Sequence, residues 1–119
     1  MGGRKLVDLE AKLFDTEKKG CLGVLVGPRK RGEIDVEVHQ DGSSRMKIGL
    51  KGLGVPEGTR QVTVHINETA VADLELQRGS AYLRLDSRHG DSVPEVSVKD
   101  VATVRVGDRV LCSGSFHRD

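Results

Sequence analysis

Apolar and polar residues alternate along most of the chain. The alternation is clearest over residues 7–13, 33–39, 45–51 and 61–66, where Val, Ile, Leu, Met or Ala occupies every second position. A period of two is typical of β-strands with one buried and one exposed face. Turn signals containing Gly, Pro or Asp recur about every 8 to 12 residues, which is the spacing of strands in β-sandwiches and barrels.

The pattern predicts an all-β protein, a two-layer antiparallel β-sandwich of about nine or ten short strands joined mostly by sequential hairpins. At 119 residues the chain corresponds to one domain, 1–119, with flexible ends at 1–4 and 117–119. The remaining expected strands carry the apolar residues Leu74 and Leu76; Ala81, Leu83 and Leu85; Val96 and Val98; Val104 and Val106.

The clearest expected pairing joins residues 33–39 to 45–51 through a five-residue loop. This loop length places Glu37 beside Lys47, so that each outward charge faces an opposite one. A slip by one residue would expose the apolar face to water, which specifies the register strongly.

Three further hairpins are expected, pairing 60–66 with 69–76, 72–76 with 81–86, and 101–106 with 109–116. The first would turn at Asn67-Glu68, or through a longer loop, because Glu is unfavourable at positive φ. The apolar positions change from odd numbers at Val71 to even numbers at Leu74, which indicates a β-bulge near Ala72 or Asp73.

Residues 6–19 permit a second interpretation. Leu6, Leu9 and Leu13 also form a helical stripe, and Gly20 would then follow the helix as its C-cap. The strand interpretation needs only the alternation, and it is the one that we expect.

The net charge and the hydropathy of the chain argue against several classes of function. Lys and Arg total 19 against 18 for Asp and Glu, so the net charge of +1 provides no general attraction to polyanions or anionic membranes. The longest apolar run, 22–26, is too short to span a bilayer, and no apolar signal segment follows Met1. We expect a cytoplasmic protein without a membrane partner, or an extracellular one if a leader precedes this chain.

The two cysteines, Cys21 and Cys112, show neither a CxxC motif nor the Cys-His spacing of a zinc site. They could form one disulfide that closes a long loop, or remain two free thiols. Without a secretory leader, free and partly buried thiols are the expectation.

The second half of the chain carries the segment 62–68 (Val-Thr-Val-His-Ile-Asn-Glu), a turn at Val93-Pro94 and a closing Ser-Gly-Ser-Phe at 113–116. It resembles a loosely defined group of uncharacterised bacterial β-sandwich domains that are distantly similar to the chordin-like repeat. In that group a Val-Asn-Gly hairpin and a Val-Pro turn precede a terminal strand ending in Ser-Gly-Thr/Ser-Phe. These motifs are structural, so the resemblance implies a β-sandwich of unassigned role.

One loop combines acid, base and nucleophile types. It runs over 86–91 and contains Asp86, His89 and Asp91 around Ser87. Turns favour the same residue types, because their side chains bond loop backbone groups. The structural interpretation is therefore the expected one, with a small hydrolase as the alternative.

The four histidines are His39, His65, His89 and His117, and none forms the i, i+2 or i, i+4 pair of a metal site. The alternation points His39 and His65 outward. We expect all four at the surface, and we expect no metal site.

A basic triplet, Arg29, Lys30 and Arg31, is expected at a hairpin tip, where it could grip phosphates. With Trp 0, Phe 2 and Tyr 1, the chain offers almost no stacking platform for nucleic acid. A solvated loop is the expected role.

No pattern identifies an enzyme, a cofactor or a small-molecule substrate. The expected function is a non-enzymatic structural or protein-interaction module that pairs with a second copy or another protein through exposed or exchanged strands. The alternatives are a nucleic-acid or polyanion binder that uses 29–31 and a small hydrolase that uses 86–91.

Overall fold

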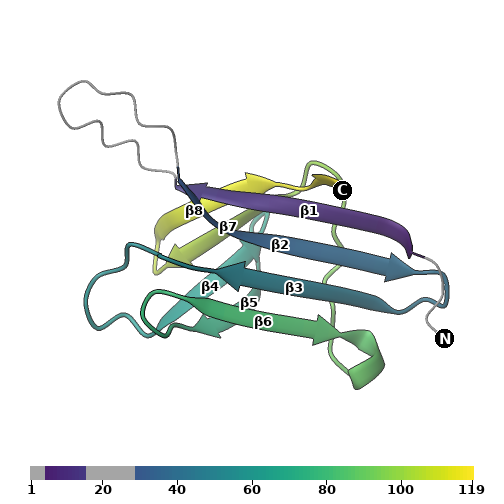
Figure 1. The fold of residues 1–119 in the computed structure, drawn as a ribbon, viewed down its shortest axis with the longest axis horizontal. Helices are drawn as coiled ribbons and strands as arrows, with labels where there is room; N and C mark the ends of the chain where they lie inside the picture. Colours follow the sequence, from purple (N-terminus) through teal and green to yellow (C-terminus); the bar gives the residue numbers. More distant parts are fainter. Residues whose placement is uncertain (1–4, 16–28) are drawn as a thin grey trace.

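The computed structural model describes residues 5–15 and 29–119. These residues form nine β-strands, one short 3-10 helix and no α-helix (Figure 1). The expected all-β antiparallel class is confirmed, and the alternative helix over 6–19 is wrong for its described part. The elements are β1 (Lys5–Asp15), β2 (Lys30–His39), β3 (Ser44–Leu50), β4 (Gln61–Ile66), β5 (Thr69–Glu75), β6 (Ala81–Asp86), η2 (Ser87–His89), β7 (Val101–Val106), β8 (Arg109–Ser115) and β9 (His117–Arg118).

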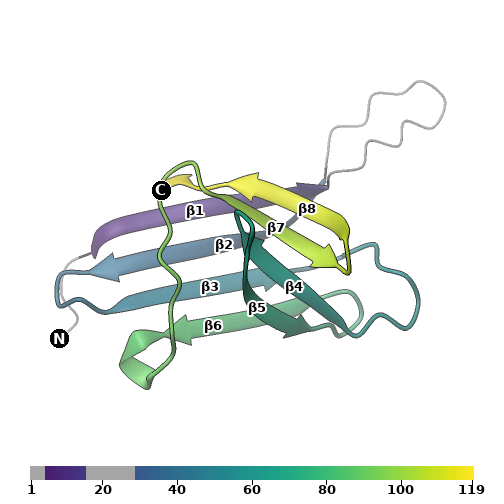
Figure 2. The same cartoon turned by 180° about the vertical axis from the view of Figure 1, so that it is seen from behind.

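The described strands belong to one continuous antiparallel sheet in the order β5-β4-β7-β8-β1-β2-β3-β6, with β9 also beside β1. The sheet folds over, so that β1, β2, β3 and β6 form one layer and β4, β5, β7 and β8 the other (Figures 1 and 2). The layers join where Phe14 and Asp15 pair with Ser113 and Cys112 of β8. Among the described residues the two free edges, β5 and β6, are bridged by the single pair Gln77–Ser80, so the sheet is nearly closed.

The core lies between the two layers and follows the alternation of the sequence. β2 and β3 bury alternate residues, β6 adds the half-buried Ala81, Leu83 and Leu85, and Phe116 adds the largest fully buried side chain from the β8–β9 link. Burial of a side chain of this size stabilises the fold by about 1.5–3 kcal/mol. The buried apolar residues are Leu9, Ala11, Leu13, Ile34, Val36, Met46, Ile48, Leu50, Leu53, Val62, Val64, Ile66, Leu74, Ala102, Val104, Cys112 and Phe116.

The β2–β3 hairpin has a different register from the expected one. Glu37 lies opposite Arg45 and Asp35 lies opposite Lys47, so the expected pair of Glu37 with Lys47 is wrong by two positions. A shift by two keeps every side chain on its face, and opposite charges still meet across the strands. The apolar face is therefore as expected although the pairing is not.

The shift arises from a loop shorter than five residues. The His39 N–H donates to the Ser43 carbonyl at 2.8 Å, and the Gly42 N–H donates to the His39 carbonyl at 3.0 Å. Gly42 adopts φ 87°, which allows a three-residue loop that ends in a left-handed residue. This local conformation, rather than charge pairing, sets the register.

Two other expected hairpins, β4–β5 and β7–β8, are confirmed. The first turns at Asn67-Glu68 with the positive φ, 55°, on Asn67. Its bulge falls at Val71, one residue before the expected position, because Val64 pairs with Ala72 while His65 pairs with Ala70.

The expected hairpin of 72–76 with 81–86 is wrong, because β6 pairs with β3. After the turn at Arg78 (φ 55°) and Gly79 (φ 76°), the chain crosses to the other layer. There Leu83 pairs with Ile48 and extends the apolar inner face.

The segment 92–100 is not the expected strand around Val96 and Val98. It runs from η2 to β7 and crosses the first layer on the side of the second (Figure 2). Val93 and Val96 pack against the core. A local turn interrupts any pairing, because the Ser97 N–H donates to the Asp100 carboxylate at 2.8 Å and Lys99 has φ 76°.

The C-terminal residues 117–119, expected to be flexible, are hydrogen-bonded to β1. β9 pairs Arg118 with Leu9 and His117 with Glu10, and the Asp119 N–H donates to the Asp8 carbonyl at 3.0 Å. The end of the chain thus pairs with residues 8–10 of β1, which β8 does not reach.

The close approach of β8 to β1 requires a residue without a side chain. A Cβ at Gly114 would clash with the backbone carbonyl of Lys12, which cannot move without disturbing the ladder. We expect Gly114→Ala to lower the free energy of unfolding by about 1–3 kcal/mol in urea titrations. Gly54→Ala is the control, since a Cβ there meets nothing within 4 Å. Equal stability of the two variants would contradict the proposed clash.

Candidate interaction edge

The two carboxylates of the loop 86–91 both accept hydrogen bonds from the loop backbone. Asp86 Oδ1 accepts the Arg88 N–H at 2.9 Å, and Asp91 Oδ2 accepts the Asp86 N–H at 2.9 Å. The first of these bonds is the main reason why the pKa of Asp86 is lowered. His89 is exposed. The loop therefore has the bonding of a capped turn.

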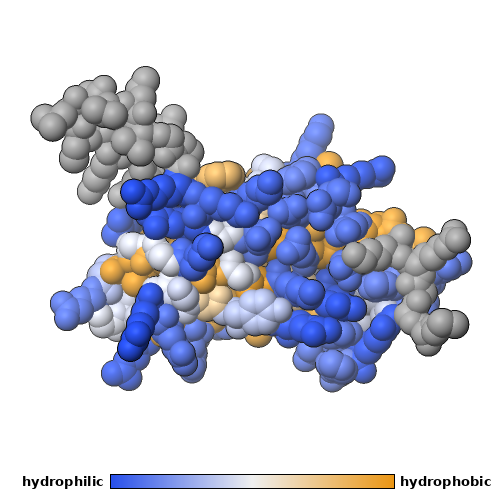
Figure 3. All heavy atoms as spheres, in the orientation of Figure 1, coloured by the Kyte–Doolittle hydropathy of each residue, from blue (hydrophilic) through white to orange (hydrophobic). Residues whose placement is uncertain are grey.

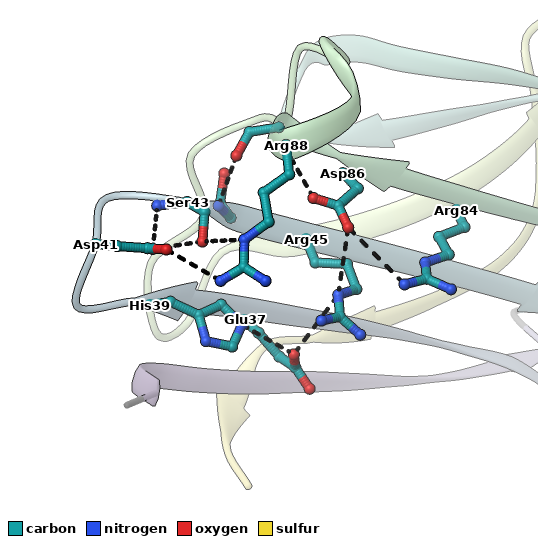
Figure 4. A network of polar contacts seen from close by, with 10 residues as sticks. Glu37, His39, Asp41, Ser43, Arg45, Arg84, Asp86 and Arg88 are labelled. Atoms are coloured by element: carbon teal, nitrogen blue, oxygen red, sulfur yellow. Dashed lines mark hydrogen bonds and ion pairs between the residues drawn. The ribbon is translucent and has the colours of Figure 1, made fainter. Parts of the chain in front are cut away.

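A polar network holds this turn on the β2–β3 loop (Figure 4). Arg88 donates to the Asp41 carboxylate and to Ser43 Oγ, each at 3.1 Å, and the Ser44 N–H donates to Ser87 Oγ at 2.8 Å. Hydrogen bonds from the side chain and the backbone of Ser43 lower the pKa of Asp41 to about 2. The network fixes the end of β6 in space.

The basic triplet is not one cluster. Arg31 Nε donates to Asp15 Oδ1 at 2.7 Å, and Arg31 also donates to the Gly52 carbonyl at 2.6 Å. Lys30 Nζ lies 3.5 Å from Glu33 Oε1, while Arg29 is exposed. Arg31 lines a small hollow of about 160 Å³ at the junction of the layers, so the three cations point to different surroundings.

Cys112 is a free thiol buried in the core, and burial raises its pKa to about 12. The other cysteine of the predicted pair, Cys21, lies outside the described residues.

The histidines lie in different environments. His39 is only 8% exposed, which corrects the expectation that it lies at the surface. It sits at the end of β2, where the register shifts, with Nε2 at 3.3 Å from Glu37 Oε2 (Figure 4). His65 is half-buried, whereas His89 and His117 are exposed.

Carboxylates crowd the outer face of β1 and β2. The pairing places Asp8 opposite Glu37 and Glu10 opposite Asp35, which are like charges. Carboxylate oxygens of Glu10, Asp35 and Asp119 lie within 4.8 Å of one another. The sequence did not indicate this cluster, because the outward positions were evident but the β1–β2 register and the position of Asp119 were not.

The pKa values of both Glu10 and Asp35 in this cluster are raised. Glu10 is 9% exposed, and its hydrogen bond with Glu33 is the main cause that raises its pKa, followed by burial and the charge of Asp119. Lys12 opposes the shift. The ionised form of Glu10 is thus disfavoured in the folded protein.

The outer face of the first layer is mainly hydrophilic, with separate apolar areas that include one at the end where β1 begins (Figure 3). Leu6 is 64% exposed, Val7 38% and Val98 43%. They line an open hollow of about 460 Å³ with Val96 and Arg118.

The outer edge of β6 is one of the two ends of the described sheet. Successive residues of a strand direct their backbone groups to alternate sides. The N–H and C=O of Asp86 both bond to Asp91, which shows that they point away from β3. The N–H and C=O of Ser80 bond to Gln77 and not to β3. Tyr82 and Arg84 share this parity, so their N–H and C=O groups also point away from β3.

No described residue is hydrogen-bonded to these four backbone groups of Tyr82 and Arg84. Tyr82 is 66% exposed on the outer face, and the Arg84 side chain is 47% exposed. The result is a short open edge, closed at both ends by turns. The sequence could not indicate it, because β6 was expected to pair with residues 72–76.

Comparison of the chain with protein-family models, with curated proteins and with solved structures found no match. Among the described residues, no helix has the length and apolar character needed to cross a membrane. The resemblance to bacterial β-sandwich domains therefore stays a prediction.

Glu10→Gln should stabilise the protein at neutral pH. A raised folded-state pKa means that ionised Glu10 destabilises the native state, a cost that disappears as the pH falls through that pKa. Glutamine keeps a hydrogen-bonding group beside Glu33 without the charge. We expect a gain of about 0.5 kcal/mol at pH ~7 that narrows toward pH ~4, measured by urea denaturation. Glu57→Gln, in an exposed turn, is the control, and an equal gain there would contradict the interpretation.

Cys112 should resist alkylation in the native state. With a pKa of about 12, only about one thiol in 10,000 is ionised at pH ~8, and the sulfur is buried. In a Cys21→Ser variant, we expect iodoacetamide to modify Cys112 only after unfolding in urea, as followed by mass spectrometry. Rapid modification of the folded protein would show that the thiol is accessible.

Proposed function

We propose that this protein is a non-enzymatic protein-interaction module that binds a partner by adding a strand to the edge of β6. The observation that carries the proposal is the set of four unbonded backbone groups on Tyr82 and Arg84. Strand addition uses such groups for affinity and the neighbouring side chains for specificity.

The other edge of the sheet, β5, is a poorer template. It contains the bulge at Val71, and its outward residues Asp73 and Glu75 are acidic and exposed. Bulges and charges are common means by which proteins protect an edge strand. β6 pairs with β3 in a regular register over its whole length, so its outer edge is straight enough to accept another strand.

The two alternative functions have less support from the geometry. A polyanion site would need Arg29, Lys30 and Arg31 on one free tip, but Arg31 is bound to Asp15. A hydrolase would need a carboxylate of the 86–91 loop that can exchange protons with a substrate, and both carboxylates accept backbone N–H groups.

The β6 sequence itself, as a peptide of residues 80–87, is a suitable probe. Added in excess to dilute protein, it should slow hydrogen exchange of the Tyr82 and Arg84 amides at least about tenfold, measured by NMR. The Leu83 amide, which points toward β3, should change little. A peptide with proline at the positions of Tyr82 and Arg84 is the control, because it lacks the required donors. Protection elsewhere, or none, would contradict strand addition at β6.

A further inference from the structure

We infer that the natural occupant of the β6 edge is the β6 edge of a second copy, paired antiparallel about a twofold axis through Leu83. This inference rests on the proposed function and names the partner of the same site. It follows from counting which backbone groups are open and which are already bonded.

A twofold axis allows only those strand registers in which paired residues of the two copies place their side chains on the same face of the sheet. With the axis at Leu83, Tyr82 lies opposite Arg84 of the second copy. The Tyr82 N–H then donates to the Arg84 carbonyl across the axis, and the Arg84 N–H to the Tyr82 carbonyl. All four open groups of each copy gain a partner in this register.

The neighbouring registers leave groups unbonded. With the axis at Arg84, Tyr82 would face Asp86, whose N–H and C=O already bond to Asp91. Two guanidinium groups would also lie directly opposite each other, which is unfavourable. With the axis at Tyr82, Arg84 would face Ser80, whose groups already bond to Gln77.

Side chains on both faces fit the Leu83 register. On the outer face, the exposed ring of Tyr82 lies beside the Arg84 guanidinium of the second copy, a favourable cation–π pair that occurs twice. On the inner face, the half-buried Leu83 meets its own copy. An open hollow of about 590 Å³ lies at the start of β6, where Glu75, Gln77 and Ser80 line it. In this register the 86–91 loop of the second copy would occupy that hollow.

The interface is small, so the dimer should be reversible. We expect sedimentation equilibrium to show a monomer–dimer equilibrium that shifts to monomer on dilution. Tyr82→Ser should weaken dimerisation at least about tenfold, the loss expected when both cation–π pairs and their packing are removed. Leu6→Ser is the matched control, because Leu6 is as exposed as Tyr82 but lies on β1.

Cysteine cross-linking tests the register. In a Cys21→Ser background, Leu83→Cys places two thiols on the axis in a non-hydrogen-bonded pair, with the short Cα separation that a disulfide needs. Mild oxidation should give a covalent dimer. Leu85→Cys, on the same face, would lie opposite Ala81 and should give none. Circular dichroism checks that each variant is folded, and Tyr82→Ser tests the edge if Leu83→Cys does not fold.

Each outcome separates the two proposals. A dimer that cross-links through Leu83→Cys and not Leu85→Cys supports the inference. A dimer that cross-links equally through both variants, or that Tyr82→Ser leaves intact, overturns the register. A chain that stays monomeric at all concentrations, yet still binds the 80–87 peptide, overturns self-pairing and leaves strand addition standing. A chain that neither forms a dimer nor binds the 80–87 peptide overturns the proposed function as well.

Discussion

The fold depends on a short backbone contact between β1 and β8. Only Phe14 and Asp15 of β1 pair with Ser113 and Cys112, among the described residues, before the two strands diverge. Gly114 allows this approach because its missing side chain leaves room for the β1 backbone. The contact turns one sheet into two facing layers and so creates the core.

The same contact determines where the edges of the sheet lie. Because β8 leaves β1 early, the remaining side of β1 is open to β9, which pairs there through His117 and Arg118. With β1 covered on both sides, β5 and β6 are the two ends of the described sheet. An open edge at β6 is thus a consequence of how the sheet closes, and the turns at Ser80 and Asp86 limit its length.

The sequence predicted the parts of the fold that depend on local pattern. Alternation identified β1, although residues 6–19 also suited a helix, and it placed the buried residues of β2, β3 and β4 on one face. It could not set the β2–β3 register, because that depended on the positive φ of Gly42. It also could not assign β6 to β3, because the choice between layers depends on contacts far apart in sequence. The open edge at Tyr82 could not be predicted for the same reason.

The geometry of the β6 edge would let the proposed dimer form without growing into fibres. A long regular edge admits many registers and successive additions, whereas an edge with two open residues admits one symmetric register. An isologous pair uses the same edge on both copies, so the contact closes and leaves no β6 edge for a third chain. The bulge at Val71 and the acidic residues Asp73 and Glu75 make β5 a poor alternative end. The pairing that we propose at β6 would therefore be self-limiting and would end at a discrete dimer.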